Sequence, residues 1–288
     1  MAITYIHEPW PTEFRTRTDI SIAWDKSDLW LSWVNTDLQL MMCRCLNPLE
    51  FTFEIPPVWD KSIPVTRDVS TGASIVTHNT GESRVVLAYA NAKGQIVVRL
   101  QEGDREHHSE VLKETTQINP ALARRSNDLW IAWAGYTDLH LNTIYSTGEF
   151  VFRDESKTTY EDDGTPGTPS LATLDNDLVL AWAGTDSEHK INAAYIGRSG
   201  EMIDKVTPNL GSFSGAWSGI SAAGYQDQFH IGWAANGSAH NITTLSGPWD
   251  DSPRLLSNEK RSIHPPALQP PLIAWIDSSS DVIYIGRV

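Results

Sequence analysis

Acidic residues and histidines recur close to tryptophans along this chain, at spacings that suit recognition of a polar ligand. A histidine stands seven residues after a tryptophan in three segments, as His140, His189 and His240. Acidic residues occupy matching stretches, at Asp37, Asp138, Asp186 and Glu188. An aromatic ring can cover the apolar face of a sugar while carboxylate, amide and imidazole groups hydrogen-bond its hydroxyls. These seven residues are therefore predicted to bind a ligand.

Each of these residues also has a purely structural explanation. Asp, Asn and Gly are the ordinary residues of hairpin turns, and a histidine nearby can be a half-exposed strand residue. In a ring of repeats, equivalent positions are spread around the ring, so the histidines are not expected to converge on a metal ion. The chain has no phosphate loop, nucleophile elbow or metalloprotease helix motif. Neither a metal nor a cofactor is expected.

The candidate residues lie in or just after copies of one repeated segment. The clearest copy is Asp177–Asp186, with the sequence DLVLAWAGTD, and related segments start at Asp28 and Asp128. Within each copy successive apolar residues alternate between two sides, which is typical of a β-strand with two buried faces. The Gly-Thr-Asp that follows is typical of a turn. The repeat therefore predicts a strand followed by a tight hairpin.

One aromatic residue marks each of six copies, and we call these six the register aromatics: Trp33, Tyr89, Trp133, Trp182, Trp233 and Trp275. They are separated by 42 to 56 residues. Strand-type repeats of about 40–50 residues indicate a β-propeller, in which each repeat is a four-stranded antiparallel blade. The sequence thus predicts an all-β, six-bladed propeller forming one domain over residues 1–288. The register aromatics are expected to pack between blades.

Further segments can be assigned to the inner and outer strands of the blades. Small–apolar–small trios are expected to form innermost strands, at Ser21–Ala23, Ala121–Ala123, Ser170–Ala172 and Ser221–Ala223. Phe51–Ile55 and Phe150–Arg153 are expected to be outer strands. Only 13 residues follow Trp275, too few to complete a blade. We therefore expect Ala2–His7 to supply the outer strand of blade 6, which closes the ring and leaves no free edge there.

Among the tryptophans outside the common register, five are singled out: Trp24, Trp30, Trp130, Trp217 and Trp249. Since inter-blade packing does not explain their positions, they are candidates for ligand binding. For Trp30 and Trp130 a role in core packing is the alternative to ligand binding. Each is interpreted as sharing a face with the register aromatic of its own strand, where it would thicken the same core layer.

Composition limits the classes of partner. The 288 residues include 22 basic and 36 acidic side chains, a net charge of −14 that would repel nucleic acids and anionic membranes. The two cysteines, Cys43 and Cys45, are expected to be small buried residues rather than a disulfide. The N-terminal segment has no signal-peptide pattern and no apolar run reaches about 18 residues. We expect a soluble protein, cytoplasmic or released without a conventional signal peptide.

The repeat resembles a known family. Ser170-Leu-Ala, the segment Asp177–Asp186 and Ile191-Asn192 resemble the LAWxGxD…LN blades of bacterial and fungal propellers described as tectonin- or lectin-like. The resemblance covers blades 1, 3 and 4 well, blade 5 partly, and blades 2 and 6 weakly. It implies a propeller that binds glycans at repeated sites. The Arg/Glu/Trp trio of the fucose-binding propellers is not found in register, so no particular sugar is implied.

These observations favour a non-enzymatic, carbohydrate-binding propeller whose partner is a glycan or another small molecule. The first alternative is an enzyme that uses the axial pocket, either a glycoside hydrolase or a cyclase or isomerase of a hydrophobic metabolite. A protein-interaction platform is the second. The hairpins after the second strands are expected to surround an axial depression in which ligands bind. Their sequences differ between blades, which keeps the enzyme alternative open, although no sialidase Asp box is present.

Overall fold

The computed structural model is built almost entirely of β-strands. Its described part contains 24 strands and a single 3₁₀ turn, η1 (Asp154–Ser156). None of the described residues forms a helix long and apolar enough to cross a membrane. The structure describes residues 10–16, 18–24, 29–47, 57–78, 84–147, 150–209, 215–236, 240–246, 254–255, 261–270 and 272–287.

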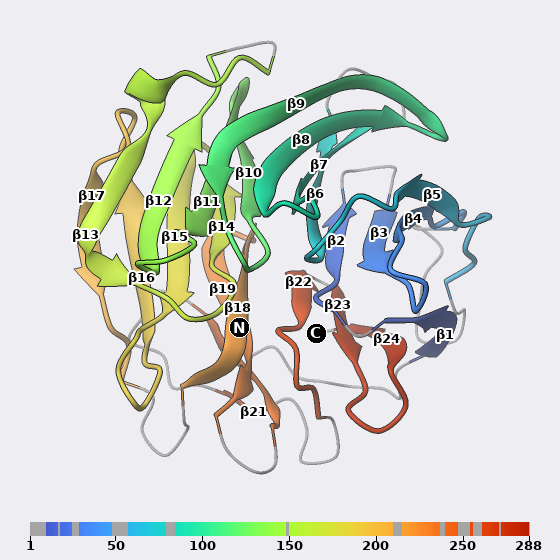
Figure 1. Ribbon diagram of the computed structural model, residues 1–288. Coiled ribbons are helices and arrows are strands. Elements are labelled where there is room, and N and C mark those ends of the chain that lie inside the picture. Colours follow the sequence, from blue (N-terminus) through green and yellow to red (C-terminus); the bar gives the residue numbers. More distant parts are fainter. Residues whose placement is uncertain are drawn as a thin grey trace.

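The strands form six four-stranded antiparallel sheets arranged around a centre, which confirms the six-bladed propeller (Figure 1). In blades 1 to 5 the strands follow chain order from the inner to the outer edge of the sheet. Blade 1 contains β2 (Ser21–Trp24), β3 (Leu29–Val34), β4 (Leu40–Arg44) and β5 (Ile63–Thr66). Blade 2 contains β6 (Ala73–His78), β7 (Arg84–Ala90), β8 (Gln95–Glu102) and β9 (Arg105–Thr115). Blade 3 contains β10 (Ala121–Arg125), β11 (Asp128–Ala134), β12 (His140–Tyr145) and β13 (Thr158–Gly164).

The second half of the ring is built in the same way, except that its last blade takes one strand from the N-terminal part of the chain. Blade 4 contains β14 (Ser170–Leu174), β15 (Asp177–Ala183), β16 (Ile191–Ile196) and β17 (Met202–Val206). Blade 5 contains β18 (Ala216–Tyr225), β19 (Gln228–Ala235), β20 (Ile242–Ser246) and β21 (Arg254–Leu255). Blade 6 contains β22 (Ala267–Gln269), β23 (Leu272–Ile276) and β24 (Val282–Arg287), with β1 (Trp10–Arg15) as its outer strand.

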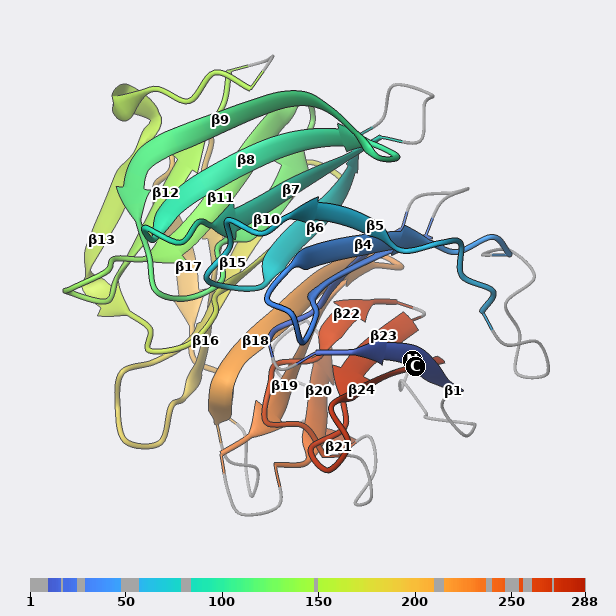
Figure 2. The same cartoon turned by 45° about the vertical axis from the view of Figure 1, so that its right-hand side comes forward.

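The pairing of β1 with β24 closes the ring (Figure 2). Trp10 lies opposite Ile285 in an antiparallel ladder, so an N-terminal strand does complete blade 6, as the sequence predicts. The pairing segment is Trp10–Arg15, whereas the expected segment, Ala2–His7, lies outside the described residues. Pro11 argues against a strand at this point, but an outer strand tolerates proline because its outward backbone groups need no ladder partner.

Two other expected outer strands also need correction. Phe51–Ile55 lies outside the described residues, and the outer strand of blade 1 is β5, at Ile63–Thr66. In blade 3 the segment Phe150–Arg153 was wrongly assigned, because Phe152 forms only an isolated bridge with Ser146 and the outer strand β13 begins later. An outer strand has one neighbouring strand and mixed burial, so its apolar pattern is weak.

The second strand of each blade is the hydrophobic centre of its sheet. In β15, Leu178, Leu180 and Trp182 pack in the cluster shared with blade 3, while Val179 and Ala181 pack in the cluster shared with blade 5. The predicted alternation is therefore confirmed. Large side chains on one face and small ones on the other allow adjacent sheets to interlock at the density of a protein interior.

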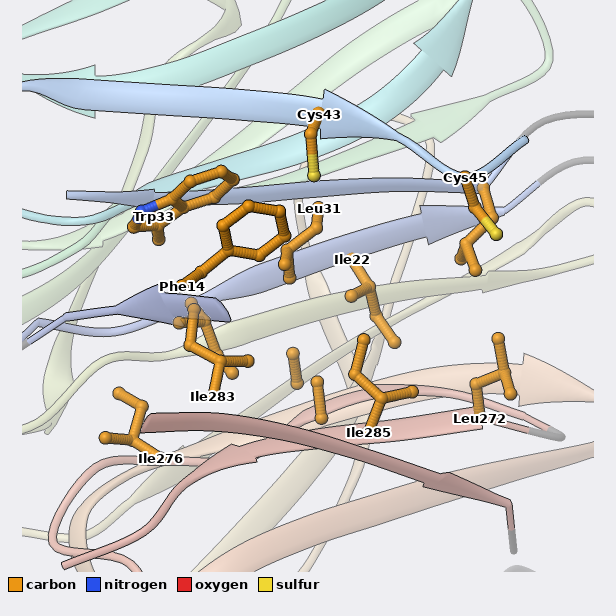
Figure 3. Packing of buried hydrophobic residues seen from close by; sticks show 14 residues of the cluster. Phe14, Ile22, Leu31, Trp33, Cys43, Cys45, Leu272, Ile276, Ile283 and Ile285 are labelled. Carbon is orange, nitrogen blue, oxygen red and sulfur yellow. The ribbon is translucent and has the colours of Figure 1, made fainter. Parts of the chain in front are cut away.

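Every register aromatic packs against the preceding blade around the ring. Their exposed fractions lie between 0% and 4%: Trp33, Tyr89, Trp133, Trp182, Trp233 and Trp275. Figure 3 shows the junction of blades 6 and 1, where Phe14 of β1 stacks on Trp33 with ring centroids 4.4 Å apart. The register aromatics are thus core residues, as expected.

Cys43 and Cys45 belong to the same junction (Figure 3). Both are free thiols in the buried cluster. Burial raises the pKa of the Cys43 thiol far above its usual value, so it stays protonated and unreactive. Their predicted role as small buried residues is confirmed.

Serines of the small–apolar–small trios connect the inner strands of neighbouring blades. Innermost strands have one free edge, and three hydroxyl oxygens accept a backbone N–H from the next blade. The pairs are Ser21 with Ile75 at 3.2 Å, Ser170 with Ala222 at 2.8 Å, and Ser221 with Leu268 at 2.9 Å. Small size alone therefore does not explain these positions, since the hydroxyl also satisfies a buried donor.

Replacing Ser221 with alanine is expected to lower the free energy of unfolding by about 1 kcal/mol, because the Leu268 N–H loses its acceptor. Urea denaturation measures this loss. Ser74→Ala is the matched control. Ser74 pairs with Ala88, just before the register aromatic of blade 2, as Ser221 pairs with Gly232 in blade 5, but it makes no such bond to described residues. Equal losses in the two variants would contradict a role for the hydroxyl.

Candidate functional site

The hairpins between second and third strands carry most of the predicted ligand residues. Asp138 Oδ1 accepts the backbone N–H of His140 at 3.1 Å, and Asp186 Oδ1 accepts that of Glu188 at 2.9 Å. The N–H of Asp37 is held in the same way by an asparagine of its own turn. The three aspartates and Glu188 are exposed, on the hairpins of blades 1, 3 and 4. Asp138 and Asp186 thus stabilise turns, and the structure does not bring them together.

The three predicted histidines are not equivalent to one another. Leu139, His189 and His240 each occupy the left-handed residue that precedes a third strand, with φ of 58°, 49° and 46°. His140 comes one residue later, as the first residue of β12, with Nδ1 3.6 Å from Asp138 Oδ2. The shared spacing of seven residues after the tryptophan does not mark equivalent positions, because the hairpin of blade 3 is one residue shorter than those of blades 4 and 5.

Two asparagines of the third strands, Asn142 and Asn192, have structural roles. Asn142 Nδ2 donates to the His140 carbonyl oxygen at 2.8 Å, and its Oδ1 accepts from the Thr159 hydroxyl at 2.6 Å. Asn192 makes the corresponding two bonds in blade 4. Each asparagine thereby ties its third strand to the fourth, and its polar atoms are occupied.

Trp30 and Trp130 lie in the core rather than on the surface. Both are 2% exposed, so neither ring offers a face to a ligand in this structure. The alternative of a shared face is also wrong: Trp30 packs toward blade 2 while Trp33 packs toward blade 6. Residues three apart on a strand point in opposite directions. The side chains of Trp217 and Trp249 lie outside the described part of the chain.

An ion pair at the junction of blades 2 and 3 was not foreseen. Glu114, near the end of β9, lies 2.7 Å from the Lys157 ammonium group, which directly precedes β13. Both side chains are partly exposed, at 21% and 31%. The Lys157 nitrogen also lies 5.7 Å from the centroid of the Trp133 ring, within cation–π range. A charged donor and a charged acceptor are therefore held together at the surface.

An exposed aromatic ring lies at the same blade junction. Tyr136, in the hairpin after β11, is 49% exposed. A methyl group on Gly94 would lie 3.6 Å from the Tyr136 ring, so the tyrosine reaches across to blade 2. The Gly94 carbonyl accepts the N–H of Thr116, two residues after Glu114. Tyr136 and the Glu114–Lys157 pair thus share one blade junction.

The junction of blades 3 and 4 repeats this arrangement without the tyrosine. Asp163 of β13 forms an ion pair with Lys205 of β17, and the Lys205 nitrogen lies 5.5 Å from the Trp182 ring centroid. Thr185 takes the place of Tyr136, since a methyl group on Gly164 would lie 3.2 Å from its side chain.

The sequence held a signal for these pairs. Glu114 and Asp163 are 49 residues apart, and Lys157 and Lys205 are 48 apart, which is one blade repeat. The signal was missed because each acid and its lysine come from different blades, some 42 or 43 residues apart in the chain.

The six innermost strands enclose an axial cavity of about 500 Å³. The end at which these strands begin is capped. Asp19 of blade 1 accepts a hydrogen bond from the Thr168 hydroxyl of blade 4 at 2.6 Å and lies 3.2 Å from His264 Nδ1 of blade 6. Gly72 packs so closely there that a Cβ atom would lie 2.5 Å from the Asp19 carbonyl oxygen. Contact between opposite blades contradicts the expected open depression on this face.

The cavity instead reaches solvent at the other end of the inner strands. Ser126 and Asp175 line that end and are exposed, whereas Asn119 and Thr168 at the capped end are buried. Asp175 lies seven residues beyond Thr168, about 23 Å in extended chain. The carboxyl pairs of glycosidases are about 5–9.5 Å apart. Asp19 and Asp175, the acids among the described lining residues, are therefore too far apart to act as such a pair.

Comparison with known proteins supports the fold. No family model and no curated protein matches the sequence. The structure of AofleA from Arthrobotrys oligospora is similar, with 11% identity, a TM-score of 0.64, and coverage of 99% of this chain and 87% of that one. The fucose-specific lectin from Aleuria aurantia has 10% identity and a TM-score of 0.54, covering 82% and 76%.

An enzyme shares the architecture as well. The GH43_1 enzyme from Xanthomonas citri, in a complex with xylose, has 14% identity and a TM-score of 0.51, covering 84% of this chain and 90% of that one. At these identities the likeness concerns the fold. This chain is thus a six-bladed β-propeller, similar in fold to a fucose-specific lectin and to a GH43_1 enzyme.

Proposed function

We propose that this protein is a non-enzymatic carbohydrate-binding propeller whose main site lies at the junction of blades 2 and 3. The observation that carries the proposal is the presence of the exposed Tyr136 ring and the Glu114–Lys157 ion pair at one blade junction. The fold shared with a fucose-specific lectin supports the same ligand class.

The chemistry of this junction suits a sugar. The exposed face of Tyr136 can cover the C–H groups of a pyranose ring. Glu114 accepts and Lys157 donates, so two neighbouring hydroxyls could bind the pair, and hydrogen bonds to charged groups are about twice as strong as neutral ones. The two groups are already positioned by their mutual contact, which reduces the entropy lost on binding.

The junction of blades 3 and 4 is proposed as a second, weaker site. It keeps the charged pair, Asp163 and Lys205, but has Thr185 where the first site has a tyrosine. A ligand contact of His140, which pairs with Gly164 within blade 3, remains a prediction. Ligand contacts of the remaining hairpin candidates remain predictions: Asp37, Asp138, Asp186, Glu188, His189 and His240.

A glycan array with the full chain tests the main site. Tyr136→Ala is expected to weaken binding of the best glycan at least tenfold, which corresponds to about 1.4 kcal/mol. Glu114→Gln should have a similar effect because it removes the charged acceptor. Glu155→Gln is the matched control, since it makes the same charge change at an exposed carboxylate on η1. Failure of the wild type to bind any glycan would refute the proposal.

The natural difference between the two junctions offers a complementary test within the same experiment. Thr185→Tyr gives the blade 3–4 junction the aromatic ring that it lacks, and it should restore binding to the Tyr136→Ala variant. If Tyr136→Ala binds as tightly as the wild type, the tyrosine is not part of a site.

A further inference from the structure

Three buried polar atoms, on residues that line the axial cavity, have no hydrogen-bond partner among the described residues. They are the Arg124 Nη1 and Trp24 Nε1 donors and the Asn119 Oδ1 acceptor, and all three are buried. Arg124, Trp24 and Asn119 line the cavity. Buried donors and acceptors without partners are rare in proteins and point to a missing water, ion or ligand.

Arg124 has no counter-charge among the described residues. Its Nε donates to the Ser126 carbonyl oxygen at 3.1 Å, and it forms no ion pair with any residue of the described part. Burial lowers the pKa of the guanidinium below its usual value. His78 of the neighbouring blade has a lowered pKa as well, first through burial and then through the charge of Arg124. Arg124 is partly buried, and no carboxylate of the described residues neutralises its charge, so an anion bound at this point would be favoured.

The acids of the cavity do not supply that anion. Asp19 lies at the capped end, where Thr168 and His264 occupy its two oxygens. Asp175 is exposed at the open end.

We propose that the axial cavity binds a small carboxylate that carries several hydroxyl groups, as a sugar acid does, entering on the face opposite the capped end. The planar guanidinium of Arg124 matches the two oxygens of a carboxylate, which favours a carboxylate over a spherical anion. Trp24 lines the same cavity, and its buried indole N–H is a donor without a described acceptor.

The rest of the cavity suits hydroxyl groups. Asn119 Oδ1 is an acceptor near the capped end, and serines and threonines of the inner strands line the walls. The extended chain from Asn119 to Arg124 is about 16 Å long. The distance between their polar groups is shorter, because the arginine side chain covers part of it. The gap fits one or two sugar units, and about 500 Å³ is within the usual range of small-molecule sites.

This site does not depend on the proposed glycan site. The two share no residue: Tyr136, Glu114 and Lys157 lie at a blade junction, outside the described lining of the cavity. A neutral glycan that binds Tyr136 requires no carboxylate.

Isothermal titration calorimetry of the full chain tests the proposal with D-glucuronate, D-glucose and inorganic phosphate as probes. D-Glucuronate is expected to bind at least tenfold more tightly than either of the others. Arg124→Gln should reduce D-glucuronate binding at least tenfold. Arg153→Gln makes the same charge change on an exposed side chain far along the chain from the inner strands and should leave binding unchanged.

A second variant guards against loss of folding in Arg124→Gln. Trp24→Phe keeps an aromatic ring and removes only the N–H donor, and it should weaken D-glucuronate binding several-fold at an unchanged melting temperature. The proposal is overturned if the wild type does not bind D-glucuronate, if phosphate or D-glucose binds as tightly, or if neither cavity variant alters the affinity. Loss of D-glucuronate binding in Tyr136→Ala would also overturn it, because that result moves the site to the blade junction.

Discussion

Replacing Trp182 with alanine is expected to lower the free energy of unfolding by about 3–5 kcal/mol, the usual cost of removing a buried aromatic side chain. The ring is 1% exposed and packs among leucines and alanines between blades 3 and 4. Lys205 covers it with its ammonium group 5.5 Å from the ring centroid. The loss has two parts: the apolar surface of the ring is no longer buried, and its removal leaves a cavity in the core.

That loss is a large part of the 5–15 kcal/mol that stabilises a typical domain. Chemical denaturation followed by tryptophan fluorescence and circular dichroism measures it. Tyr136→Ala is the control, because removal of a half-exposed ring should change stability by about 0.5 kcal/mol or less. A loss below about 1 kcal/mol in Trp182→Ala would mean that the register aromatics do not hold the blades together.

Replacing Phe14 with alanine is expected to destabilise ring closure by about 3–5 kcal/mol. Phe14 is the buried anchor of β1, 6% exposed, and its ring stacks on Trp33 of blade 1 (Figure 3). It thereby joins the outer strand of blade 6 to the second strand of blade 1. No covalent link closes this junction in the described residues, so side-chain packing and the β1–β24 ladder must do so.

The neighbouring residue provides a matched control. Glu13 lies on the opposite, exposed side of β1, so Glu13→Ala should change stability little. Hydrogen exchange locates the effect: in Phe14→Ala the amides of β24 should lose protection before those of blades 3 and 4. Uniform loss of protection around the ring would show that blade 6 is not the weak point.

The two proposed sites follow from the way the inner strands are held. The Asp19–Thr168–His264 cap closes one end of the axis. The glycan recognition that we propose on that side is therefore assigned to the blade junctions, which carry Tyr136 and the charged pairs. The carboxylate site that we propose lies in the cavity behind the cap, which a ligand would enter from the opposite face.

By itself the sequence determined the strands, the number of blades and the origin of the closing strand. Leu178, Leu180 and Trp182 could be assigned to one face because side-chain direction on a strand depends only on residue parity. A repeat of blade length then implied six sheets. Where burial is one-sided, as in the outer strands β5 and β13, the same local pattern was too weak and the assignments failed.

Only the tertiary structure decided which residues meet. Glu114 and Lys157 are 43 residues apart in sequence, and Asp19 and Thr168 are 149 apart. His140 and His189 looked equivalent in sequence but are offset by one position in the ring. The physical reason is that strand patterns are local, whereas the contacts that bring these charged groups together join different blades. Their spacing is set by inter-blade packing and ring closure, which no single segment encodes.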